Sequence, residues 1–180
     1  LGGANQIRRL ISTVISNGAL SLNTTTGLSV DGTVSANAVS LISAAAITQA
    51  TNAQIWTNTL NVSAVTGVNL TASGFGANNI GNLGTIANTT SGGITIANAY
   101  PSMNLTGNIT AAGQAVSISN TMAGINQTGG IITAGALSLS AAGAISATRN
   151  NAFDSLGVVT AAGDVAITNI GQLMVTGSVN

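Results

Sequence analysis

The sequence predicts an all-β protein whose chain winds into a triangular parallel β-solenoid, and three observations support this prediction. Aliphatic residues alternate with small or polar ones in short strand-like pieces, as in GALSLSAAGAISA from Gly135 to Ala147. These pieces recur along the whole chain at intervals of about 21 residues. Gly and Asn, which tolerate tight bends, separate them. Three short strands per recurring interval is the arrangement of a triangular solenoid coil.

The first strand of each expected coil has the form aliphatic–x–aliphatic. The first residues of these strands are separated by 19, 21, 34, 22, 21 and 28 positions. They are Leu20, Val39, Leu60, Ile94, Val116, Leu137 and Val165. Stacked coils are expected to place Leu20, Val39 and Leu60 directly above one another, about 4.8 Å apart.

The second and third strands of each coil follow at similar spacings. Second strands come eight or nine residues after the first, at Leu28, Ile47, Val68, Met103, Ile125, Ile145 and Leu173. Third strands come six to eight residues later still, at Val34, Ile55, Ile109, Ile131 and Val179. Leu, Ile and Val take the inward positions and Ser, Thr and Asn the outward ones. We therefore expect aliphatic columns inside the coil and polar ladders outside it.

The two long intervals predict an enlarged corner in every third coil. Residues 75–86 and 149–158 form an extra block in these intervals, and the first block resembles residues 5–14. Two series step by 73 positions, namely Asn5, Asn78 and Asn151, and Leu10, Leu83 and Leu156. We expect residues 1–180 to form one solenoid segment of a longer chain or filament, with three-coil super-repeats starting near residues 5, 78 and 151. The enlarged corners are expected to form bumps that contact partners.

The near absence of charge argues against several classes of partner. The 180 residues contain three basic and three acidic side chains, no His and no Cys, whereas an ordinary domain is about 25% charged. Such a surface has no long-range attraction for nucleic acid. No apolar run approaches the roughly 18 residues of a membrane-spanning helix. We therefore expect neither a nucleic-acid partner nor membrane insertion.

The sequence offers no candidate catalytic, cofactor-binding or metal-ligating residues. Without His and Cys, a Ser-His-Asp or Cys-His site and an ordinary zinc site are excluded. A glycoside-cleaving site needs two carboxylates about 5–9 Å apart. Asp154 and Asp164 are ten residues apart and are expected on different sides of a coil, and Asp31 lies several coils away. The glycines of residues 73–76 lack the Lys and the helix of a phosphate loop, so we interpret them as a corner.

Three surface features have both an ordinary and a functional interpretation. Arg8 and Arg9 are either a solvated pair or a small anion-binding patch. Trp56 follows inward-facing Ile55, so it is expected to point outward, over its own corner or toward a carbohydrate or a neighbouring strand. Asn-x-Ser/Thr sequons, which allow glycosylation, occur at Asn23, Asn61, Asn69, Asn88, Asn104, Asn108 and Asn126.

Two long runs carry a family resemblance. The run GALSLNTTTGLSVDGTVSANAVSLISAAAITQ, from Gly18 to Gln49, resembles the repeats of filamentous-haemagglutinin-type passengers. The run AVSISNTMAGINQTGGIITAGALSLSAAGAIS, from Ala115 to Ser146, resembles them as well. Such repeats occur in large bacterial surface adhesins exported by two-partner secretion, and the resemblance spans almost the whole chain. It implies a right-handed parallel β-helix that is elongated, extracellular and displayed at the cell surface.

Together these features predict a structural segment of an extracellular bacterial rod or filament, adhesive or biofilm- and matrix-forming, and not an enzyme. The expected partners are further copies, end to end or side by side, the surface of a host or neighbouring cell, and attached glycans. Two alternatives remain. A polysaccharide-active β-helix enzyme would need clustered acids or an Arg–Asp groove, and a phage or viral fibre segment would share the solenoid but usually trimerise.

Overall fold

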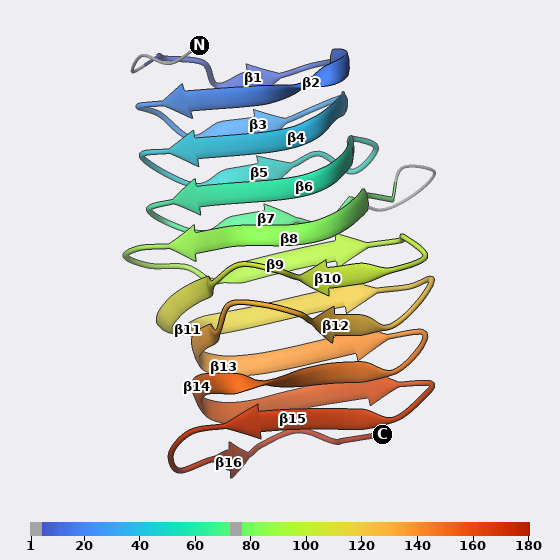
Figure 1. Ribbon diagram of the computed structural model, residues 1–180. Coiled ribbons are helices and arrows are strands. Elements are labelled where there is room, and N and C mark those ends of the chain that lie inside the picture. The colour runs from blue at the N-terminus through green and yellow to red at the C-terminus, as the bar shows by residue number, and fades with distance from the viewer. Residues whose placement is uncertain (1–4, 73–76) are drawn as a thin grey trace.

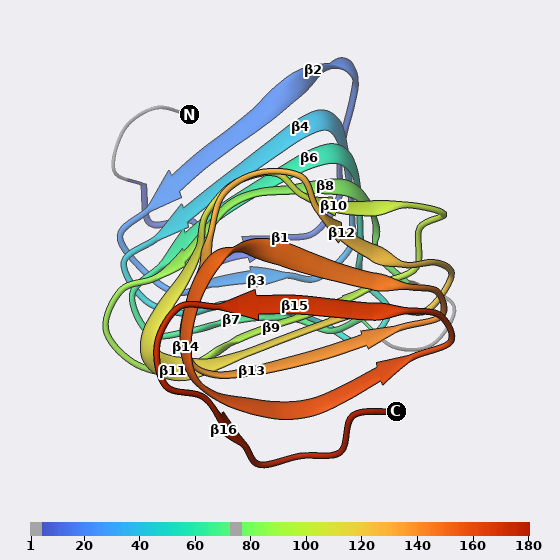
Figure 2. The ribbon, with the colours of Figure 1, turned by 60° about the horizontal axis from the view of Figure 1, so that its bottom comes forward.

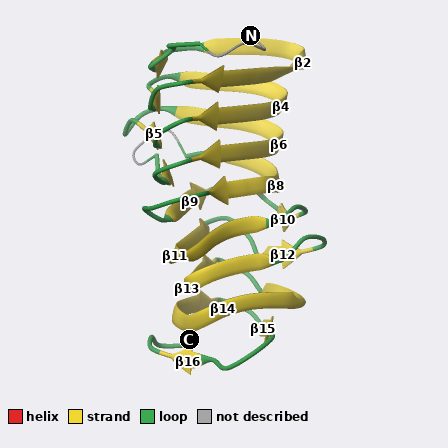
Figure 3. Ribbon diagram, turned by 90° about the vertical axis from the view of Figure 1, so that its left-hand side faces the viewer, coloured by secondary structure: helices red, strands yellow, loops and turns green. Residues whose placement is uncertain are grey.

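The computed structural model describes residues 5–72 and 77–180. These residues form strands joined by turns, and no helix occurs among them (Figures 1 and 3). The strands are β1 (Arg9–Leu10), β2 (Thr13–Thr24), β3 (Leu28–Val30), β4 (Thr33–Ser43), β5 (Ile47–Gln49), β6 (Gln54–Ala64), β7 (Val68–Leu70), β8 (Asn79–Asn88), β9 (Ile94–Asn98), β10 (Met103–Leu105), β11 (Ile109–Asn120), β12 (Ile125–Gln127), β13 (Ile132–Ala141), β14 (Ile145–Ala161), β15 (Val165–Asn169) and β16 (Met174–Val175). The predicted all-β class is confirmed.

The strands pair in parallel from one coil to the next. Leu20 pairs with Val39, and Val39 pairs with Leu60, so the predicted column is confirmed. The chain makes about eight turns with a spacing of about 21 residues, as in a right-handed parallel β-helix. The oblique view of Figure 2 shows the coils lying over one another around a common interior. Neighbouring strands in a sheet are about 4.8 Å apart, so each coil advances the rod by that amount.

Each coil has three straight pieces, two of which run together in one bent strand. In β4, Val34 and Ala36 are buried before the bend and Val39 and Leu41 are buried after it. Buried residues are two apart within each piece, as the pleat of a strand requires. Across exposed Asn37 they are three apart, and this shift turns the chain onto the next side of the triangle. The short strand β5 forms the third side.

The core consists of aliphatic columns along the axis. One column runs through Leu28, Ile47, Val68, Ile94, Val116, Leu137 and Leu156. All seven are buried. Removing such a side chain from water contributes about 1.5–3 kcal/mol. The columns give the chain a dry interior along its length, and the chain has no cysteine.

Two buried amide pairs interrupt the aliphatic core in the same way. Asn78 Oδ1 accepts hydrogen bonds from Gln49 Nε2 (2.7 Å) and from the Ile55 amide (2.9 Å), while its Nδ2 donates to Gln49 Oε1. Asn151 repeats this pattern with Gln127 Nε2 (2.8 Å), the Ile132 amide (2.8 Å) and Gln127 Oε1. Both asparagines are fully buried. The 73-residue step therefore has a physical basis inside the rod.

The register corrects the predicted enlarged corners. Leu83 stacks on Leu60, whereas Leu156 stacks on Leu137 in the neighbouring column. Ile94 pairs with Val68 and Val165 pairs with Ile145, so neither continues the column of Leu20 as the sequence interpretation assumed. The intervals of 34 and 28 residues therefore contain one additional strand. A step of 73 residues covers three coils and one further side, and repeats follow one another on different sides of the rod.

The two extra blocks lie mainly in the wall of the solenoid. Residues 79–86 belong to β8, and residues 149–158 belong to β14, which continues without a break to Ala161. One longer connection, residues 71–78, does join β7 to β8, but the second block has no counterpart. The prediction of an enlarged corner in every third coil is therefore wrong. Phe75 and the glycine-containing stretch 73–76 lie outside the described residues, as do residues 1–4.

Candidate functional site

The carboxylates lie in different parts of the described chain. Asp31 accepts hydrogen bonds from the Ser29 hydroxyl and from Arg9 Nε in the preceding coil. These two donors lower the pKa of the Asp31 carboxyl, the Ser29 hydrogen bond being the larger cause. Asp154 belongs to β14 and Asp164 precedes β15. No group of three or more potential metal-ligating side chains occurs among residues 5–72 and 77–180.

Arg8 and Arg9 do not form a shared anion site. The guanidinium of Arg9 is engaged in an ion pair with Asp31, and this pair joins the first two coils. The side chain of Arg8 is exposed, while its carbonyl accepts a hydrogen bond from the Ser29 amide (2.8 Å). An exposed ion pair of this kind contributes little to stability.

Trp56 points outward, as its position after Ile55 predicts. Ile55 is fully buried, and Trp56 is 49% exposed. On the outer surface Trp56 pairs with Ser35 in the preceding coil and Asn79 in the following one. It therefore lies in a ladder of small polar residues, where its ring is accessible to a partner.

The sequons differ in their accessibility. Asn69, Asn108 and Asn126 are exposed, and Asn23, Asn61 and Asn104 are partly buried. Asn88 is buried and its Nδ2 donates to the carbonyls of Ser91 (2.9 Å) and Gly92 (2.6 Å). A glycan on Asn88 would break these bonds, so exposed sequons are the structurally compatible ones.

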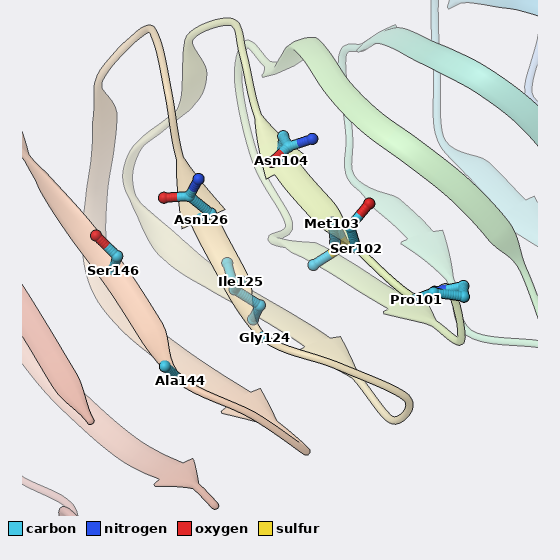
Figure 4. A pocket seen from close by; sticks show the side chains of 9 residues that line it. All are labelled: Pro101, Ser102, Met103, Asn104, Gly124, Ile125, Asn126, Ala144 and Ser146. Carbon is cyan, nitrogen blue, oxygen red and sulfur yellow. The ribbon is translucent and has the colours of Figure 1, made fainter. Parts of the chain in front are cut away.

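A shallow groove of about 430 Å³ crosses the outer face of β10, β12 and β14. Asn104, Asn126 and Ser146 project from the same side of these neighbouring strands (Figure 4). Asn104 Nδ2 donates to Asn82 Oδ1 (3.2 Å), which extends the polar ladder toward β8. Small residues at Gly124 and Ala144 leave the groove open beside Pro101. Its lining contains no charged side chain.

A larger hollow of about 570 Å³ lies at the corner where the short strands end, and we call it the Arg149 hollow. Its lining residues come from three successive coils and are Asn108, Gly129, Gly130, Ile131, Thr148, Arg149 and Asn150. Sequence reasoning noted Arg149 as a charged residue of an extra block but did not bring it together with Asn108 or Ile131. Their spacing by about one coil was the available signal, and the register was needed to use it.

Comparison with known proteins yields no match to any protein family, curated protein or solved structure. The described part of the chain also contains no helix able to cross a membrane. The candidate surfaces are therefore interpreted from their chemistry alone. They offer amide and hydroxyl groups, one accessible tryptophan and one guanidinium in a hollow.

Proposed function

We propose that this chain is a structural segment of an extracellular bacterial rod or filament that serves adhesion or forms a biofilm matrix. The observation that carries the proposal is the unbroken inner stack, in which seven aliphatic residues from Leu28 to Leu156 lie in one buried column. Each coil is hydrogen-bonded to the next along the axis. Such a structure resists bending without needing bound metal or disulfides.

The outer surface suits an exposed environment. It carries few charges, so its properties change little with salt. Ser, Thr and Asn side chains on the outer ladders can hydrogen-bond to another copy or to a cell-surface partner. The resemblance to filamentous-haemagglutinin-type repeats supports an extracellular, cell-surface location. We propose partners of two kinds, further copies of the chain and the surface of a host or neighbouring cell.

Electron microscopy tests the architecture at the level of the assembled material. Immunogold labelling of the source cells with an antibody against residues 1–180 is expected to mark thin rods several nanometres across outside the cell envelope. Labelling confined to the cell interior, or to compact particles, contradicts the proposal. Light scattering of the purified chain is the companion measurement, because a defined trimer would favour a viral fibre.

Adhesion is tested separately from shape. Cells lacking the gene are expected to form weaker biofilms or to bind surfaces less well than their parent, and re-expression restores the phenotype. A Trp56→Ser variant probes the one accessible aromatic ring, while Thr85→Ser serves as a matched change at another exposed outer position. Equal adhesion by the gene-deleted and parent cells contradicts the adhesive role.

A further inference from the structure

The Arg149 hollow is open because its corners are built from glycine. A Cβ atom on Gly130 would lie 2.2 Å from the carbonyl carbon of Gly107 in the coil before it, and one on Gly129 would lie 2.5 Å from the Thr106 oxygen. Gly130 also has a φ of +58°, which side-chain-bearing residues rarely adopt. Close coil packing therefore excludes side chains here and leaves a recess between Asn108 and Arg149.

Hydrogen-bond donors surround this recess. Arg149 Nη2 donates to the Thr128 carbonyl, and no other printed contact occupies its guanidinium among the described residues. Asn108 uses its Oδ1 to accept a bond from the Ile131 amide (3.0 Å), which leaves its Nδ2 as a donor. Thr148 and Asn150 are exposed on the rim. No carboxylate lines the hollow, so the charge of Arg149 is not neutralised locally.

A buried network holds the backbone beneath the guanidinium. The Arg149 amide donates to Gln127 Oε1 (3.1 Å), and the same oxygen accepts a bond from Asn151 Nδ2 (3.0 Å). Asn151 is fully buried and also donates to the Ala147 carbonyl (2.9 Å). The backbone that carries Arg149 is therefore anchored on both sides, which favours a pre-formed site.

The solenoid does not need an arginine at this position. The other copy of the 73-residue repeat keeps the amide pair of Gln49 and Asn78. At the positions that align with Thr148, Arg149 and Asn150 it has Phe75, Gly76 and Ala77. The buried pair belongs to the scaffold, whereas the polar rim is particular to the second copy. A feature that the scaffold can lack is a candidate for recognition.

We infer that the Arg149 hollow binds an acidic saccharide through its carboxylate. A guanidinium forms two parallel hydrogen bonds with a carboxylate, and this geometry suits a uronic acid. The amides of Asn108 and Asn150 and the Thr148 hydroxyl match ring hydroxyls, and Ile131, 40% exposed, offers an aliphatic surface for the ring. A single cation does not suit a polyphosphate, which is bound by several.

Calorimetric titration of the 180-residue chain with trigalacturonic acid tests the inference. Binding is expected, and Arg149→Gln is expected to weaken it at least about tenfold because the charged partner of the carboxylate is lost. Arg149→Lys keeps the charge without the planar fork and is expected to fall between the two. Arg8→Gln, which removes an exposed arginine elsewhere, is the matched control and is expected to bind like the unaltered chain.

Three further probes separate the outcomes. The methyl ester of trigalacturonic acid is expected to bind at least about tenfold more weakly than the free acid, since it lacks the charge. Equal binding of the ester, or of Arg149→Gln, overturns the inference. Tighter binding of a heparin hexasaccharide assigns the site to sulfate, and equally tight binding of acetate removes the saccharide, so either result also overturns it.

Folding is checked independently of binding. Far-UV circular dichroism and the thermal midpoint of Arg149→Gln are expected to match those of the unaltered chain. Should this variant fail to fold, Asn150→Ala on the rim replaces it, with an expected loss of about threefold or more in affinity because a hydroxyl contact is removed. Undiminished binding by Asn150→Ala then contradicts the inference. The rod proposal uses microscopy and adhesion, so either proposal can fail alone.

Discussion

At the scale of single residues, the buried amides set the polar interior apart from the aliphatic columns. Asn98 Oδ1 accepts a bond from the Ile80 amide (2.9 Å) and its Nδ2 donates to the Ile80 carbonyl (3.0 Å). Asn169 does the same with Phe153 in the second repeat copy. These side chains replace the strand partner that the neighbouring coil lacks at a corner. Buried polar groups are retained because they are paired.

Replacing a buried amide is expected to cost more than replacing its exposed neighbour. Asn151→Ala leaves the Ile132 amide and the Gln127 side chain without their partner, which destabilises the fold by about 3 kcal/mol. Asn150→Ala, at an exposed position, is expected to change stability by less than about 0.5 kcal/mol. Urea unfolding followed by circular dichroism measures both. Equal effects would contradict a structural role for the amide pair.

Two glycines separate the cost of backbone conformation from that of a clash. Gly113→Ala is expected to cost about 1–2 kcal/mol, because φ is +72° but nothing lies within 4 Å of the added Cβ. Gly130→Ala adds a backbone clash with Gly107 to a similar φ of +58°, so its loss is expected to be clearly larger. Thermal unfolding of the two variants compares them. A smaller effect at Gly130 would contradict the tight coil packing at this corner.

Asp31 links stability to acid pH. The hydrogen bonds from Ser29 and Arg9 lower its pKa below the ordinary value of 3.8. A lowered folded-state pKa stabilises the fold above pH 3.8 and loses that contribution as pH falls through the lower folded value. Thermal midpoints between pH 6 and 2 are expected to fall at the acid end and to do so less in Asp31→Asn. An identical acid slope in the variant would assign the effect to other groups.

At the scale of the strand, each column residue depends on the coils on both sides. Leu60 lies between Val39 and Leu83 and is fully buried. Leu20 lies in the first described coils, pairs with Val39 and is only partly buried. Strand position and inward direction follow directly from the alternation of residues. The pairing partner does not, because aliphatic–x–aliphatic pieces resemble one another on all sides.

Truncation along one column is expected to reveal this difference. Leu60→Ala leaves a cavity between two packed neighbours and is expected to cost about 2–5 kcal/mol. Leu20→Ala, the matched change at a partly buried position, is expected to cost less because solvent already reaches the site. Urea unfolding measures the two losses. A larger loss at Leu20 would contradict the stacking order of this column.

At the scale of the whole molecule, the rod is a stack in which a coil can be removed in register. Val39 pairs with Leu60 and Ala38 pairs with Thr59, so deleting residues 39–59 joins equivalent points of neighbouring coils. The shortened chain is expected to fold with one coil fewer and a rod about 4.8 Å shorter. Deleting residues 76–85 instead removes most of the inward residues of β8 and is expected to disrupt packing. Circular dichroism and small-angle X-ray scattering distinguish the two deletions.

The relation between the two repeat copies also belongs to this scale. Leu83 and Leu156 are 73 residues apart and both are buried, but they occupy different columns. What the copies share lies inside, in the aliphatic and amide positions. Their outer residues differ, as the aligned pairs Gly81 with Asp154 and Thr85 with Val158 illustrate. The repeat therefore maintains the core, and each side of the rod is free to carry its own surface chemistry.

The amino-acid sequence by itself determined the strands, their inward faces, the coil length and the low-charge surface. These follow from local alternation and composition, which do not depend on distant residues. Only the tertiary structure decided which strand lies over which, because the additional strands after Leu60 and Leu137 shift the phase of the winding. The same register brings Asn108, Ile131 and Arg149 to one hollow. A site assembled across coils depends on stacking, and stacking is set by packing of the whole core rather than by any one segment.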